Sequence, residues 1–175
     1  MKKPVVVISA LLISFVSILF LNQLLKFAFV SAMNIGGTLE FSGISLNVHI
    51  PATIHINEIK NLLIVISPLF ASMLFIEFSF WLSDKTENYN IKSTLIIFLL
   101  INAGYLILSV LLGVFSLLLK TPLSNDWKIY FSRGELNYDR QLLYLFMFIL
   151  LLLGYINIIT KRIKRIIPVI RKNNN

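Results

Sequence analysis

The sequence predicts an all-α membrane protein, a bundle of four transmembrane helices with a short β-hairpin-like loop after the first helix. Two features of the composition lead to this fold class. Of the 175 residues, 57% are hydrophobic, with a mean hydropathy of +0.83, and only 14% are charged. Soluble domains carry fewer apolar residues and many more charges. The chain has room for one polytopic membrane domain over residues 1–175.

Four apolar stretches are long enough to cross a bilayer, and we place the spans at about residues 5–33, 62–82, 93–119 and 141–160. The first stretch would be about 43 Å long at ~1.5 Å per residue, so it must tilt or project beyond a hydrocarbon core of about 30 Å. We expect the second span to be bent or interrupted at Pro68, because its ring removes one backbone donor.

The start of the chain has two interpretations. A basic head at Lys2 and Lys3 followed by an apolar run is typical of a signal peptide, and Val30-Ser31-Ala32 resembles a cleavage site, so residues 1–32 could be removed. The apolar run is longer than a signal peptide needs, which favours a retained anchor helix.

Two segments outside the spans carry a pattern. After the first span, apolar and polar residues alternate on both sides of Ser42-Gly43, which predicts a short hairpin. Before the last span, Trp127 and other aromatic residues stand among charges, which predicts an amphipathic segment at the membrane interface. The apolar residues of the hairpin are Leu39, Phe41, Ile44, Leu46, Val48 and Ile50.

Lysine and arginine are distributed unequally, with ten on one side of the predicted membrane, five on the other, and Lys26 unassigned. Cytoplasmic segments carry the excess, so we predict both termini to be cytoplasmic. The basic C-terminal tail, residues 161–175, would then meet anionic lipid headgroups. The net charge of +8 thus indicates phospholipid, and not nucleic acid, as the anionic partner.

Polar residues inside the spans are the candidates for a functional site. Asn22, Gln23 and Lys26 interrupt the first span, Glu77 lies in the second, and Asn102 lies in the third. Amides and charges are costly when they face lipid, so we expect these side chains to pack inside the bundle or to line a polar path.

His49 and His55 are the candidates for a metal site. On a regular strand they would share a face, and Glu58 follows them. A metal ion would still need a further ligand from elsewhere in the fold, and the alternative is that both are exposed loop histidines. We predict no cofactor.

Five positions follow an order that is found in one family of membrane enzymes. Asn22 and Lys26 stand where two zinc-binding histidines would be, and Gln23 stands where a glutamate base would be. The predicted hairpin follows; then Pro68 resembles a Gly-Pro element, and Asp126 resembles an aspartate ligand. In this order the chain resembles the site-2 protease family of intramembrane zinc peptidases, with every diagnostic residue except Pro68 and Asp126 replaced.

The resemblance implies a relative without catalytic activity. Zinc hydrolysis needs imidazole ligands and a carboxylate that accepts a proton, and an amide such as Gln23 cannot act as that base. The resemblance also implies that Asn22, Gln23 and Lys26 form hydrogen bonds across the bundle, with Lys26 paired to Glu77 or Asp126.

We therefore predict a small integral-membrane accessory, scaffold or interaction protein, whose partner is another membrane protein or a second copy of the chain. Two alternatives stay open. One is a transport or immunity-type component with a polar path at Lys26, Glu77 and Asn102. The other is an intramembrane hydrolase-like protein, which would need His49, His55 or Asp126 to converge.

Overall fold

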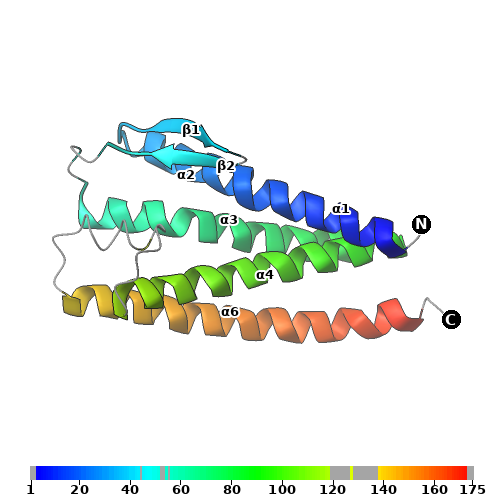
Figure 1. Ribbon diagram of the computed structural model, residues 1–175. Helices are drawn as coiled ribbons and strands as arrows, with labels where there is room; N and C mark the ends of the chain where they lie inside the picture. Colours follow the sequence, from blue (N-terminus) through cyan, green and yellow to red (C-terminus); the bar gives the residue numbers. More distant parts are fainter. Residues whose placement is uncertain are drawn as a thin grey trace.

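The four predicted spans are helical in the computed structural model of the chain, and each helix is long and apolar enough to cross a membrane. The helices pack as a bundle, and the beginning of the first and the end of the last lie at the same end of it (Figure 1). That this end faces the cytoplasm stays a prediction from the charge count. The structure describes residues 3–43, 45–51, 54, 56–118, 127 and 138–172.

The helices are longer than the predicted spans because polar residues at their ends are helical too. Asn57 begins the second long helix, since its side chain accepts a hydrogen bond from the Ile59 amide at 2.8 Å, and Asn88 caps the third in the same way. The bounds are α1 Lys3–Val16, η1 Ser17–Leu21, α2 Asn22–Ala32, α3 Glu58–Lys85, α4 Tyr89–Leu118 and α6 Tyr138–Lys172.

α6 continues past residue 160, where the fourth span was predicted to end, and reaches Lys172. The predicted tail over residues 161–175 is therefore helical as far as the structure describes it. Lysine and arginine are good helix formers, and adding residues to an existing helix avoids the unfavourable step of nucleation.

The first span changes its neighbour halfway along. α1 packs against α4, whereas α2 packs against α3. Between them η1 is a π-helical segment, which accommodates one extra residue without ending the helix. The chain thus stays helical from Lys3 to Ala32 while the face that contacts the bundle changes.

The predicted hairpin is present as the antiparallel strands β1 (Thr38–Ser42) and β2 (Ser45–His49). Gly43 in the turn has a φ of 62°, which glycine adopts without the steric penalty of a side chain. The hairpin folds back along α2, and β2 also contacts η1 (Figure 1). Leu46 in β2 and Ile50 just after it are buried, so the hairpin covers the first span with apolar side chains.

α3 is continuous through Pro68, so the span is not interrupted there. The other expected effect of this residue, a bend, stays a prediction. Proline has no backbone N–H, and the carbonyl of Ile64 therefore loses its usual helical donor. The hydroxyl of Ser67 donates to this carbonyl oxygen at 2.8 Å. A side chain thus replaces the missing backbone hydrogen bond.

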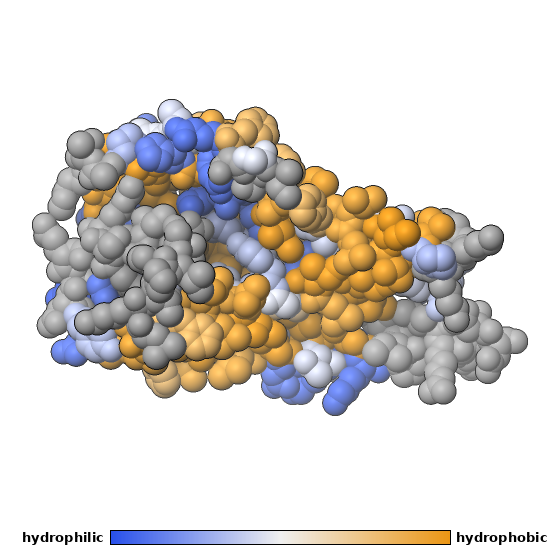
Figure 2. Space-filling model, in the orientation of Figure 1, coloured by the Kyte–Doolittle hydropathy of each residue, from blue (hydrophilic) through white to orange (hydrophobic). Residues whose placement is uncertain are grey.

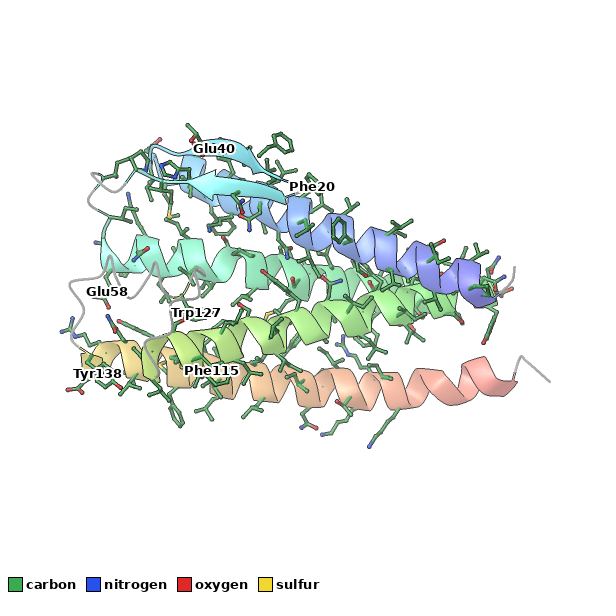
Figure 3. The ribbon with its side chains drawn as sticks, in the orientation of Figure 1. Phe20, Glu40, Glu58, Phe115, Trp127 and Tyr138 are labelled. Carbon is green, nitrogen blue, oxygen red and sulfur yellow. The ribbon has the colours of Figure 1, made fainter. Side chains whose placement is uncertain are left out.

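The main core lies between α3, α4 and α6 and includes Trp127 from the segment that joins α4 to α6. Trp127 is buried inside the bundle (Figure 3), and the other residues of the amphipathic segment predicted around it, between α4 and α6, lie outside the described residues. Gly113 of α4 makes room for it, because a Cβ at this position would lie 3.0 Å from the indole ring. Phe148 of α6 also packs against Trp127, and the centroids of the two rings are 5.7 Å apart.

Candidate functional site

η1 turns Asn22 toward the rest of the bundle. Along α1 and into η1, the buried residues Ala10, Ser14 and Ser17 recur at helical spacing. A continued α-helix would next bury position 21, but Leu21 is 41% exposed and Asn22 is fully buried. The extra residue of the π-helical segment shifts the buried face by one position, about 100° around the helix axis.

Asn22 forms a buried hydrogen bond between α2 and α3. Its Nδ2 atom donates to Oγ of Ser72 at 3.2 Å, and both residues are fully buried. The Oδ1 atom of Asn22 is buried and has no hydrogen-bond partner among the described residues. The amide of Asn22 therefore takes part in helix packing.

Lys26 lies one turn further along the same face of α2 and is only 6% exposed. One more turn along, Val30 belongs to a small buried cluster with Ile64 of α3. α2 and α3 run in opposite directions (Figure 1). Asn22 faces Ser72, and Val30 lies near Ile64. Lys26 is midway between Asn22 and Val30, so it lies opposite Pro68, which is midway between Ile64 and Ser72.

These residues lie along the contact between two helices, which we call the α2–α3 seam. Residues 68 and 72 lie about one turn apart along α3, and both are buried. The seam brings together three of the positions that carry the family resemblance, at residues 22, 26 and 68. Its members are Asn22, Lys26, Pro68 and Ser72.

Gln23 does not belong to the seam. It lies one position further around α2, where its residue is only partly buried, and its Oε1 atom has no hydrogen-bond partner among the described residues. The expected hydrogen bond of Gln23 across the bundle is therefore not formed by its Oε1 atom.

Asn102 lies at the same height as the seam on the neighbouring helix. Ser72 is 13 residues before the end of α3, and Asn102 is 13 residues after the start of α4, which follows a short turn. Asn102 is fully buried, and its Nδ2 atom donates to the Phe98 carbonyl at 2.9 Å. This bond stays within α4, and the side-chain oxygen has no partner among the described residues.

Glu77 makes its contacts on the opposite side of α3, with α6. One carboxylate oxygen accepts a hydrogen bond from the Tyr155 hydroxyl at 3.0 Å, and the other forms an ion pair with Arg162. The sequence suggested Lys26 as the partner, and the polar path through Lys26, Glu77 and Asn102 is not assembled by these contacts. Arg162 was missed because it was assigned to the tail, and no sequence signal linked Tyr155 or Ser72 to a partner.

The histidine and aspartate candidates do not assemble a site in the described structure. His49 ends β2 and is exposed. His55 and Asp126 lie outside the described residues. Within the parts of the chain that are described, no group of three or more histidine, aspartate and glutamate residues could hold a metal ion.

An apolar groove lies beside the seam, between the first span and α3. Its volume is about 360 Å³. The groove has no polar residue in its lining, which distinguishes it from the polar path that the sequence suggested. It is lined by Leu21, Leu24, Leu25, Ala28, Ala71, Leu74 and Phe75.

Comparison with known proteins adds no relative. No family model matches the chain. No curated protein and no solved structure matches it either.

Proposed function

We propose that this chain is a non-catalytic membrane interaction protein, whose α2–α3 groove binds a transmembrane helix of a partner membrane protein. The observation that supports it is the contact of Asn22 with Ser72. A residue at the position of a zinc ligand is engaged in helix packing, and a carboxamide that donates to a hydroxyl is not arranged for metal chemistry.

The composition of the groove supports the proposal that it binds a transmembrane helix. Small residues let transmembrane helices approach closely, and the groove has one on each side, Ala28 on α2 and Ala71 on α3. Its larger residues include Leu24 and Leu74, which are 44% and 49% exposed. A lining of apolar side chains only is suited to the apolar surface of a helix within a bilayer.

Site-specific photocrosslinking in the native membrane tests the partner. A photoreactive amino acid at Leu24 or Leu74 should give a crosslinked product of defined mass. The matched control is Leu151 of α6, which is 67% exposed and lies outside the groove, and it should give no such product. Recovery of monomer alone would count against the proposal, and a product of twice the chain mass would identify a second copy as the occupant.

Metal analysis tests the proposal that the protein is not a zinc enzyme. Purified protein in detergent, exposed to zinc and then washed, should retain far less than one zinc ion per chain. Stoichiometric zinc that is lost in Asn22→Ala would contradict the proposal and would favour a hydrolase-like function.

A further inference from the structure

At the end of the bundle that holds both ends of the chain, exposed apolar side chains give way to cations on two helices. On α3 the large exposed apolar residues stop at Trp81, and Lys85 follows. On α6, the last large exposed apolar residue up to residue 164, where the description of its side chains ends, is Ile158, and a basic turn at residues 161–164 follows. Figure 2 shows the same change, from apolar surface to hydrophilic residues, along the α6 edge. Such a change is typical of the level where hydrocarbon meets the headgroups.

Arg162 connects the two helices at this end of the bundle, because it lies on α6 and contacts α3. Its guanidinium contacts the Glu77 carboxylate of α3 and lies 5.3 Å from the ring centroid of Phe80, one turn further along. The contact with Glu77 uses one terminal nitrogen, whereas a guanidinium carries five N–H donors. Because the side chain is 45% exposed, other donors face outward.

Lys85 is held at the same end by an aromatic side chain. Its Nζ atom lies 4.1 Å from the ring centroid of Trp81, which stacks on Phe78 with centroids 5.6 Å apart. Tryptophan is enriched at membrane interfaces, and lysine extends along apolar surface to place its ammonium there. The aromatic pair thus offers a surface for an acyl chain directly below a cation.

We propose that this rim binds the phosphate group of an anionic phospholipid, with Arg162 as the principal contact. Guanidinium groups bind phosphate through paired N–H donors. Exposed acids at Asp84 and Glu87 lie at the same end. Among the residues there whose side chains the structure describes, however, cations outnumber acids: Lys85, Lys92, Lys161, Arg162 and Lys164 against Glu77, Asp84 and Glu87. The apolar surface below the cations favours a lipid headgroup over free phosphate. The rim consists of Lys85, Lys161, Arg162 and Lys164.

Spin-labelled lipids test the proposal on the full chain in liposomes. Electron paramagnetic resonance measures the preference of the protein for labelled phosphatidylglycerol over labelled phosphatidylcholine. Arg162→Gln should lower this preference by about fivefold, the effect of one cation near a charged surface. Arg140→Gln, which removes an exposed arginine from the other end of α6, should leave the preference unchanged. Inorganic phosphate in solution should not abolish it.

Glu77→Gln should change the lipid preference in the opposite direction. This second variant keeps the test valid if Arg162→Gln does not fold. It removes the acid that competes for Arg162, so the preference for phosphatidylglycerol should rise. Three results would overturn the proposal: no preference in the unmodified protein, loss of the preference on adding inorganic phosphate, or an unchanged preference in both variants. Loss only after neutralising Arg165, Arg171 and Lys172 would also overturn it, because the part of the tail beyond the rim would then be the binding element.

Discussion

The two sides of α3 hold polar residues in different ways. Toward α2, Ser72 receives a hydrogen bond from the neutral amide of Asn22, and both side chains are fully buried. Toward α6, Glu77 forms an ion pair with Arg162, and the two side chains are 43% and 45% exposed. One helix thus carries a buried neutral contact near its middle and a partly exposed charged contact near one end.

The difference follows from the free energy of burial. A neutral polar group can be buried if it is hydrogen-bonded, whereas a buried charge requires close pairing and further hydrogen bonds. Glu77 lies where α6 becomes basic, so its charge keeps both a partner and access to the polar surroundings. We therefore expect the α2–α3 seam to be sensitive to mutation and the Glu77 contact to be tolerant.

Deletion of Ile18 should have the largest effect, because it removes the extra residue of η1. A continuous α-helix would rotate Asn22 and Lys26 by about 100° away from α3. We expect a loss of more than about 3 kcal/mol in the free energy of unfolding, since two polar side chains would face lipid. Thermal unfolding in detergent, followed by circular dichroism, measures this. Ile18→Leu keeps the length and is the control; equal melting temperatures would refute the role of η1.

Removal of the buried hydrogen bond should have the next largest effect. Asn22→Ala leaves the Ser72 hydroxyl without its donor and should lower the free energy of unfolding by about 1–3 kcal/mol. A double-mutant cycle with Ser72→Ala should give a coupling energy of about 0.6 kcal/mol, the average for such bonds in membrane proteins. Unfolding in mixed micelles measures both values. A coupling energy of zero would mean that the two side chains do not interact.

Loss of the charged contact should have a smaller effect. Glu77→Ala should lower the free energy of unfolding by about 1 kcal/mol or less, because exposed ion pairs contribute little. The effect should shrink at high salt, which screens exposed charges, whereas that of Asn22→Ala should not. The same micelle experiment at low and high salt separates the two. A larger loss in Glu77→Ala than in Asn22→Ala would reverse the comparison.

Tyr155→Phe should have the smallest effect. The hydroxyl lies 3.0 Å from Glu77 and 3.2 Å from the Met73 carbonyl, and removing it leaves the Glu77 ion pair with Arg162 in place. We expect a loss of about 0.5 kcal/mol. Tyr138→Phe, at the exposed start of α6, is the control and should be neutral. A loss as large as that of Asn22→Ala would show that the hydroxyl, and not the ion pair, holds α6 on α3.

Much of the fold could be predicted because its signals are local. Apolar runs of the required length located the four long helices, and alternation around Gly43 located the hairpin. Two features that depend on single side chains could not be predicted from these local signals. Ser67 supplies the hydrogen bond that keeps α3 continuous at Pro68, and Gly113 admits Trp127 into the core.

The candidate site was predictable only in part. Asn22 and Lys26 could be singled out because polar residues inside an apolar run must find polar surroundings. Their partners could not be identified, since Ser72 is 50 residues from Asn22 and Arg162 is 85 residues from Glu77. Periodicity also assigns the wrong neighbours when it is carried across η1, because one extra residue changes the face of the helix.

By itself, the sequence determined that the chain forms four long apolar helices with a hairpin, and that a few polar side chains inside them need partners. Composition and spacing suffice for this, because burial of apolar surface and satisfaction of the backbone are local requirements. Only the tertiary structure decided which side of α3 each polar group meets. The rotation at η1 and the crossing of the first span from α4 to α3 set those contacts, and both depend on packing between segments far apart in the chain.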